Sequence, residues 1–371
     1  MRTYFFFSFL MAFFSPALGL WGQPPLRRTV VEVGSDAPIA YAHVYWLHAA
    51  HRGTLTNSEG QFVLGESEVT DTLVIRHLGY ASYRVAAGYL PPDTIRIAPQ
   101  ALELSPVAIY DVTGPAVFQS VLDALDRNHA VEPVRYQAFM RNMVYDADRG
   151  KLHLVAEYEL EAFHHPNHSV DLHISKARLR TCSAEGKHHY SGDNLPLVLI
   201  AVADAHWDNL YQSALKWQRR TLKTHEIRLA GGLVEAGRPV IQLDLIPSDA
   251  GKHPFFTLYI DEASFAVTRL IERNPGGRVA EWTFQEVRQK WYVSSHHQTQ
   301  VLDGLGINER VTIYHIVPTG QKGSEFLGYV GTRLRPVDSY LGAWDDPFWQ
   351  QYHHLPLPDW MKAIVAAEGS K

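Results

Sequence analysis

Cysteine is almost absent from this chain, whose 371 residues include a single one, Cys182. One thiol cannot form a disulfide within the chain, so the fold has to be stabilised by buried apolar surface. Runs of like charge are also lacking, because no stretch of Lys or Arg exceeds two residues and the formal net charge is -5. This pattern offers no basic surface to a nucleic acid, and we expect no nucleic-acid partner.

Long apolar stretches are lacking after the first twenty residues, so no later segment is expected to cross a bilayer as a helix. The first twenty residues, MRTYFFFSFLMAFFSPALGL, combine one basic residue, an apolar run and the small residues Ala17 and Gly19. This order is typical of a signal peptide. We therefore expect residues 1–19 to be a signal peptide that is cleaved near Gly19, and the alternative is an uncleaved anchor.

Recognisable catalytic motifs are lacking as well. The chain has no G-x-S-x-G nucleophile elbow and no phosphate-binding glycine loop. The zinc-peptidase pattern H-x-x-E occurs at His129–Glu132, and a chain with 20 His and 19 Glu should contain about one such match by chance. We expect no catalytic residues and no cofactor, and the rival interpretation is a hydrolase whose site is assembled from dispersed His, Asp and Glu residues in the C-terminal domain.

Short β-rich runs separated by turn residues fill the chain from Thr29 to about Ile109. Within them the stretch Arg52–Leu64, RGTLTNSEGQFVL, has two extended runs around the turn Asn57–Gly60. Glycine at the end of this turn fits a backbone position with positive φ. The spacing of the runs predicts a β-sandwich over residues 28–110.

Three segments of this region carry a resemblance to a known family. APIAYAHVYW, RGTLTNSEGQFVL and DTLVIRHLGYASYRV are similar, in order and spacing, to the carboxypeptidase-regulatory-like domain at the N-termini of many envelope proteins of Bacteroidetes-type bacteria. The resemblance implies a transthyretin-like β-sandwich without catalytic residues. It further implies an exported protein of the periplasm or outer membrane, in which this domain is either a docking module or a folding spacer.

A second domain is expected over residues 114–371. Val117, Val121, Leu122 and Leu125 have helical spacing, and Pro133 should end that helix. Strands with alternating apolar and polar residues follow, joined by short turns, as in KLHLVAEYELEAF. The pattern predicts a mainly β, α+β fold in which a large antiparallel meander or half-barrel carries a few helices.

The second domain also resembles known proteins. The segments LYIDEASFAVTRLIE, KWYV and DDPFWQQYH are similar to the uncharacterised β-rich region that often follows the regulatory-like domain in such envelope proteins. The plan of a helix on a large antiparallel sheet is similar to the half-barrel of periplasmic lipoprotein carriers. That likeness implies a curved sheet and a helical lid that hold an acyl chain.

Two groups of polar residues are candidates for binding a cation. Imidazoles at His164, His165 and His168 could bind zinc or copper, although adjacent side chains of an extended segment point to opposite faces. Three carboxylates share one strand face, and we expect cross-strand basic neighbours to balance them. These carboxylates are Glu157, Glu159 and Glu161, and the basic residues of a later run are Lys176, Arg178 and Arg180.

The strands FFTLYID and SFAVTRLIE have apolar residues on both faces, more than one short helix can cover. We therefore expect an apolar concavity between the sheet and the helix WDNLYQSALKW, with Trp207, Leu210 and Tyr259 as candidate ligand-binding residues. The alternative is that the aromatic side chains of Trp344, Phe348 and Trp349 fill this space. The sequence thus favours a non-catalytic envelope protein, peripherally associated with the outer membrane, that binds a protein partner or an apolar, lipid-like molecule.

Overall fold

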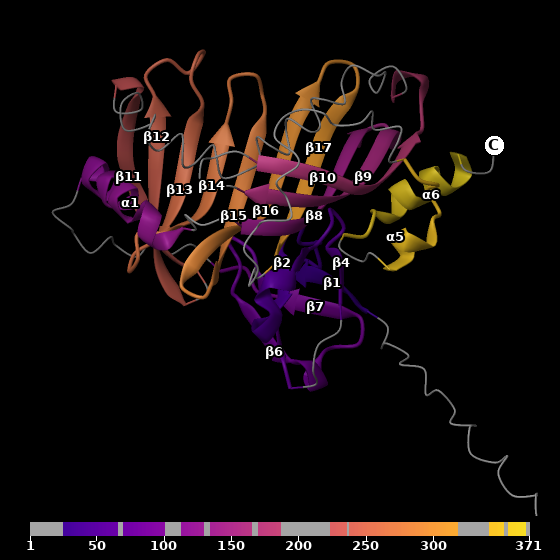
Figure 1. Cartoon of the computed structure of the whole chain (residues 1–371), viewed down its shortest axis with the longest axis horizontal. Helices are drawn as coiled ribbons and strands as arrows, with labels where there is room; N and C mark the ends of the chain where they lie inside the picture. The colour runs from indigo at the N-terminus through magenta and orange to yellow at the C-terminus, as the bar shows by residue number, and fades with distance from the viewer. Residues whose placement is uncertain are drawn as a thin grey trace, which may run out of the picture.

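The computed structural model describes residues 25–65, 70–100, 113–129, 134–164, 170–186, 223–235, 237–317, 341–351 and 355–368. Over these ranges the fold is mainly β: an N-terminal β-sandwich precedes a large open antiparallel sheet with few helices (Figure 1). This confirms the predicted fold class. Residues 1–19 and the segment 101–112 lie outside the described ranges, so the predicted signal peptide and domain boundary stay predictions. Among the helices that are described, none has the length and apolar character required to span a bilayer.

The N-terminal module, residues 25–100, consists of two small sheets with strand orders β4-β1-β7 and β3-β2-β5-β6. Both sheets contribute to one apolar core that includes Val30, Trp46, Phe62 and Leu73. The elements of the module are β1 (Leu26–Glu32), β2 (His43–Trp46), η1 (Leu47–Arg52), β3 (Thr54–Leu55), β4 (Gln61–Leu64), β5 (Thr72–Arg76), β6 (Tyr83–Ala86), η2 (Ala87–Tyr89) and β7 (Thr94–Ile97).

The turn at Asn57–Gly60 joins β3 to β4 and has the conformation that the sequence predicts. The Asn57 side-chain oxygen accepts hydrogen bonds from the backbone N–H groups of Glu59 (3.0 Å) and Gln61 (2.9 Å). Gly60 has a φ of +73°, and a Cβ atom there would lie 2.3 Å from the carbonyl oxygen of Val30. The turn therefore requires glycine for both its conformation and its close approach to β1.

The large sheet has ten strands in the order β10-β9-β8-β17-β16-β15-β14-β13-β12-β11. All neighbouring pairs are antiparallel, so the chain from β11 to β17 is a simple meander and the β8–β10 group joins it at β17. The strands are β8 (Val134–Asp146), β9 (Lys151–His164), β10 (Val170–Thr181), β11 (His225–Glu235), β12 (Arg238–Pro247), β13 (Phe255–Asp261), β14 (Val267–Arg273), β15 (Val279–Val287), β16 (Lys290–Leu302) and β17 (Gly306–Val317).

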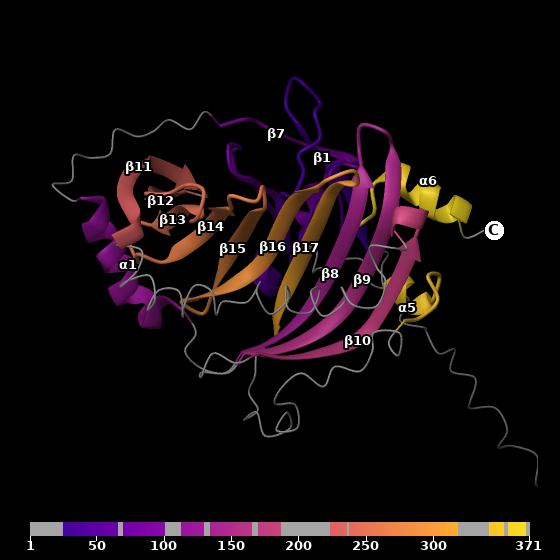
Figure 2. The same ribbon diagram turned by 90° about the horizontal axis from the view of Figure 1, so that it is seen from above.

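The sheet is bent into an arc and has two different faces (Figure 2). Helix α1 (Gly114–Asn128) lies inside the curve, and we call this the inner face. The N-terminal module lies on the opposite side, which we call the outer face. Strand β9 shows the alternation between them, because Leu154, Ala156 and Tyr158 belong to the inner-face core whereas Val155 packs on the outer face.

The outer face is covered by the N-terminal module and by the C-terminal helices α5 (Pro347–Gln351) and α6 (Asp359–Glu368). Leu55 of the module and Trp349 of α5 share a buried cluster with Phe139 and Val311 of the sheet. Trp349 and Phe348, and Trp344 in a neighbouring cluster, thus pack on the outer face. The helix WDNLYQSALKW lies outside the described residues, so the alternative in which these three side chains fill the space beside it stays a prediction. Coverage of both faces also explains why the β13 and β14 strands are apolar on both sides.

Candidate functional site on the inner face of the sheet

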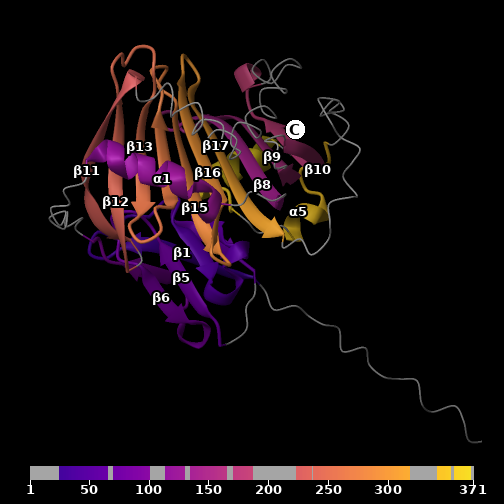
Figure 3. The same cartoon turned by 60° about the vertical axis from the view of Figure 1, so that its left-hand side comes forward.

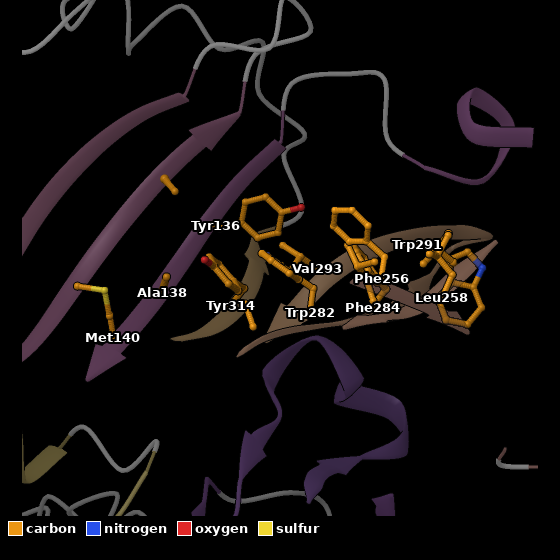
Figure 4. Packing of buried hydrophobic residues seen from close by; sticks show 14 of the residues in the cluster. Tyr136, Ala138, Met140, Phe256, Leu258, Trp282, Phe284, Trp291, Val293 and Tyr314 are labelled. Carbon is orange, nitrogen blue, oxygen red and sulfur yellow. The ribbon is translucent and has the colours of Figure 1, made fainter. Parts of the chain in front are cut away.

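One continuous apolar cluster extends over the inner face from β10 to β11 (Figure 4). Its members range from Ile174 and Ala177 at one end of the sheet to Ile227 at the other. The apolar residues of the outer face fall into separate clusters instead. Side chains converge on the concave side of a bent sheet and diverge on the convex side, so this difference follows from the curvature.

Large aromatic side chains form the centre of the inner face (Figure 4). Tyr136 of β8 and Tyr314 of β17 meet edge to face, with 5.8 Å between their ring centroids. Burial raises the pKa of both phenols well above the ordinary value, so both are neutral hydroxyls at every physiological pH. The neighbouring strands contribute Phe256, Trp282, Phe284 and Trp291.

Polar residues border this aromatic centre on the strands β8, β17 and β16. Asn142 and Arg310 are register partners across β8 and β17, and His296 lies opposite Thr312 across β16 and β17. All four side chains are buried. The His296 ring also lies 4.9 Å from the Trp282 ring, centroid to centroid. The inner face is therefore amphipathic, with an extended apolar surface that contains a group of polar side chains including one arginine.

Helix α1 runs across the strands on the β11 side of the inner face (Figure 3). Val117, Phe118 and Val121 pack into the inner-face cluster, so the predicted helix and most of its apolar stripe are confirmed. The helix begins at Gly114, where a Cβ atom would lie 2.4 Å from the carbonyl oxygen of Ile227 in β11. Glycine thus allows the helix to start in direct contact with the edge of the sheet.

The end of α1 is held by a lysine. The Lys290 ammonium donates to the carbonyl oxygens of Asp126 (2.9 Å), Arg127 (2.8 Å) and His129 (3.3 Å). A cation at this position satisfies carbonyl groups that have no partner within the helix and interacts favourably with the helix dipole. With both ends attached to the sheet, α1 is a fixed cover over part of the inner face.

The structure describes one of the three candidate ligand-binding residues. Tyr259 is buried on the outer face, in a cluster with Leu233, Val240 and Ile271, so it does not line the inner face. Trp207 and Leu210, with the rest of the helix WDNLYQSALKW, lie outside the described residues. The predicted concavity against that helix therefore stays a prediction.

The candidate metal ligands are only partly described. His164 is the last residue of β9, and His165 and His168 lie outside the described residues. Another histidine pair, His296 and His297, shows the expected divergence, because the first faces inward and the second contacts Glu309 on the outer face. Within the described ranges, no group of three or more His, Cys, Asp or Glu side chains is arranged to hold a metal ion.

The carboxylates of β9 have the basic neighbours that the sequence predicts. Glu157 pairs with Arg178 of β10, and Glu159 lies opposite Lys176 in the register of the two strands. Glu161 instead pairs with Arg135 of β8 at 2.7 Å. These contacts support the interpretation of this row as a set of cross-strand interactions.

Sequence reasoning did not single out the inner-face aromatic residues. Trp282 and Tyr314 occur in AEWTFQEV and RVTIYHIV, whose alternation predicts strands, whereas no strand was predicted around Tyr136 or Trp291, which lie in β8 and β16. The available signal was aromatic enrichment at inward-facing positions of several strands. The strand order that brings Tyr136 beside Tyr314, about 180 positions later in the chain, is not encoded in any local pattern.

Comparison with known proteins gives likeness of fold alone. No family model matches the chain, and no curated protein matches it. Among solved structures, a LolA-superfamily protein of Nitrosomonas europaea is similar at 10% identity, with 55% of this chain and 91% of that chain covered and a TM-score of 0.30. A DUF1329-family protein of Desulfovibrio piger is similar at 10% identity, 57% and 95% coverage and a TM-score of 0.28. The complex of MucA and MucB of Pseudomonas aeruginosa is similar at 10% identity, 55% and 94% coverage and a TM-score of 0.19. Scores of this size carry no functional weight.

Proposed function

We propose that this protein is a non-catalytic exported envelope protein that binds an apolar, lipid-like molecule on the inner face of its curved sheet. The observation that carries the proposal is the continuous apolar cluster from β10 to β11, with its aromatic centre inside the curve. Apolar ligand sites are concave and lined mainly by hydrophobic and aromatic side chains, with a small number of polar groups that orient the ligand. The inner face has this composition.

The polar border supports an amphipathic ligand. Arg310 and Asn142 lie at one side of the aromatic centre, where they could receive a polar or anionic head group while the tail lies along Tyr314 and Trp282. Burial of each methylene group of the tail contributes about 0.8 kcal/mol. An acyl chain of moderate length would therefore bind through its tail, and Arg310 would set its direction.

We also propose the assignments that the sequence resemblance implies. Residues 28–110 would be a carboxypeptidase-regulatory-like domain, residues 1–19 an export signal, and the periplasm or the outer-membrane surface the site of action. The packing of the module against the outer face supports an intramolecular role for it. Leu55 lies in a cluster with Phe139, and the Asn57 side-chain amide donates to the carbonyl of Pro356 at 3.2 Å.

Native mass spectrometry of the protein purified from its own envelope, before and after extraction with organic solvent, tests the proposed binding. We expect an extractable adduct with the mass of a lipid or fatty acid. After extraction, a fluorescent fatty-acid probe should bind saturably and be displaced by unlabelled fatty acid. A protein that carries no adduct and does not bind the probe would refute the proposed function.

Two buried aromatic residues on opposite faces provide matched variants. Trp282→Ala removes a ring from the inner face, and Phe139→Ala removes one from the outer face. Both changes should cost about 3 to 5 kcal/mol of stability. Only Trp282→Ala should weaken probe binding, by at least tenfold, when both variants are compared at a temperature where each is folded. Equal weakening by both variants would point to a general loss of structure and would contradict a site on the inner face.

A further inference from the structure

A polar cavity lies on the other side of the sheet, between the N-terminal module and the outer face. Its volume is about 220 Å³, roughly seven times the ~30 Å³ that one water molecule occupies in the liquid. The module contributes His43, Tyr45 and Arg76 to its walls, and the sheet contributes Arg269 and Thr283 among others. The cavity therefore has room for a small molecule and exists only because the module is docked on the sheet.

Two guanidinium groups line this cavity, one from the module and one from the sheet. Arg76 belongs to β5 of the module, and its guanidinium lies over the Tyr45 ring at 5.5 Å from the centroid. Arg269 belongs to β14, and its side chain is 8% exposed. Within the described part of the chain, the buried Nε atom of Arg76 has no hydrogen-bond partner, and that of Arg269 has none but lies 3.4 Å from the Glu281 carboxylate. A buried donor without a partner costs about 1 to 3 kcal/mol, and a bound acceptor would recover that free energy.

Two of the carboxylates of the cavity wall pair with a third arginine. Arg238 forms ion pairs with Glu286 (2.7 Å) and Asp261 (3.7 Å), and Asp261 also accepts hydrogen bonds from the backbone and side chain of Ser264. Glu235 lies 3.6 Å from Arg269, and Glu281 lies 3.4 Å from the same guanidinium, so Arg269 is flanked by two carboxylates in loose ion pairs. Arg76 has no described ion pair of its own, so positive charge on the module side of the cavity is not balanced by a direct partner.

The pKa of His43, a residue of the cavity wall, reflects its burial and the charges around it. Its pKa is lowered to about 3, mainly by burial and to a smaller extent by the nearby charges of Arg269 and Arg76. Its Nε2 atom lies 2.9 Å from the Thr283 hydroxyl and 3.0 Å from the Ser295 hydroxyl. A neutral imidazole with hydroxyl neighbours is compatible with an anion nearby, and the charges of the two arginines lower its pKa in the same direction as burial does.

We propose that this cavity binds a small molecule through an anionic oxygen group, a carboxylate or a phosphate, held between Arg76 and Arg269. Guanidinium groups present donors in a planar fork that matches both kinds of oxyanion. Because one arginine comes from the module and the other from the sheet, the bound anion connects the two parts of the chain. Binding should therefore stabilise the docked arrangement by linkage.

Calorimetric titration of the purified full chain with sodium phosphate and with sodium succinate, against sodium chloride at equal ionic strength, tests this site. We expect saturable binding of at least one of the two anions and a matching rise in Tm. Phosphate alone, succinate alone or both would support the site and would identify the preferred oxyanion. No saturable binding of either anion above the chloride baseline would overturn it.

Single arginine variants distinguish anion binding in this cavity from a general effect of removing positive charge. Arg76→Gln should weaken binding of the selected anion at least tenfold, and Arg76→Lys, which keeps the charge but loses the fork, should weaken it less. Arg228→Gln is the matched control, because Arg228 is also an outer-face arginine in a 3.5 Å ion pair, with Asp244, but does not line the cavity. Circular dichroism confirms that each variant is folded. Unchanged binding by Arg76→Gln, or equal loss in Arg228→Gln, would overturn the proposal.

Discussion

The Arg141 guanidinium donates to the Glu157 carboxylate across β8 and β9, with 2.6 Å between Nε and Oε1, and both side chains are buried on the outer face. Glu157 also pairs with Arg178, and Arg141 also donates to the backbone carbonyls of Leu355 and Pro356. Burial of the carboxyl opposes ionisation, but the two arginines outweigh it and hold the pKa of Glu157 below its ordinary value. This pair therefore attaches the segment before α6 to the sheet.

Replacement of Arg141 by methionine should destabilise the fold strongly. The substitution keeps much of the side-chain length but leaves Glu157 with a single arginine and removes the donors to two carbonyls. Breaking a buried pair in this way costs about 3 to 5 kcal/mol, so urea unfolding should show a loss of about 3 kcal/mol. Arg96→Met, which breaks the exposed pair with Asp36, should cost less than about 1 kcal/mol. Similar losses in the two variants would contradict the assigned role of the buried pair.

Half of this ion-pair network could be predicted from the sequence. Period-two alternation places Glu157 and Arg178 each on the charged face of its own strand, and the two strands are neighbours in the sheet. The role of Arg141 could not be predicted, because its partners Leu355 and Pro356 are more than 200 positions away and reach it only through the packing of the C-terminal segment. Alternation assigns residues to faces, but it does not say what covers a face.

Gly60→Ala should destabilise the protein more than Gly79→Ala does. Both glycines have positive φ, +73° and +86°, so both substitutions impose backbone strain of about 1 kcal/mol. At Gly60 the new Cβ would also meet the Val30 carbonyl oxygen at 2.3 Å, whereas nothing lies within 4 Å at Gly79. Thermal unfolding should therefore show an additional loss of about 1 to 3 kcal/mol for Gly60→Ala. Equal effects would contradict the close approach of the turn to β1.

Acid should destabilise the docked module through His43. The folded-state pKa is about 3 and the unfolded value about 6.5, so between these pH values the unfolded chain binds a proton that the folded chain does not. The free energy of unfolding should then fall as pH decreases from 6.5 toward 3, by about 1.4 kcal/mol per pH unit for this group. Urea unfolding of the parent and of His43→Gln from pH 8 to pH 4 measures this slope.

The variant should have a shallower pH dependence than the parent below pH 6. Above pH 7.5 the two curves should run parallel, because His43 is neutral in both the folded and the unfolded state there. A variant whose slope below pH 6 equals that of the parent would show that His43 is not held neutral in the folded protein. That result would also remove the electrostatic support for the anion site.

The docking of the module illustrates what sequence patterns leave open. The turn Asn57–Gly60 was predicted from its residues, but its contacts with the C-terminal segment were not. The Gln61 side-chain amide donates to Asp359 at 2.9 Å, and the Glu59 carboxylate accepts a hydrogen bond from the Asp359 backbone N–H at 2.8 Å. Both contacts join residues about 300 positions apart, so local sequence propensity does not predict them.

Leu55 and Phe139 should be energetically coupled, because they share one buried cluster across the interface between the module and the sheet. Leu55→Ala and Phe139→Ala should each cost about 2 to 5 kcal/mol, and in the double variant the losses should fall short of their sum by at least about 0.5 kcal/mol. Leu73→Ala provides the control, since Leu73 is equally buried but belongs to the core of the module alone. Its effect should add to that of Phe139→Ala within about 0.5 kcal/mol. Denaturant unfolding of the three single variants and the two double variants measures all the required losses of stability. If the losses are additive in both double variants, the module does not dock through Leu55.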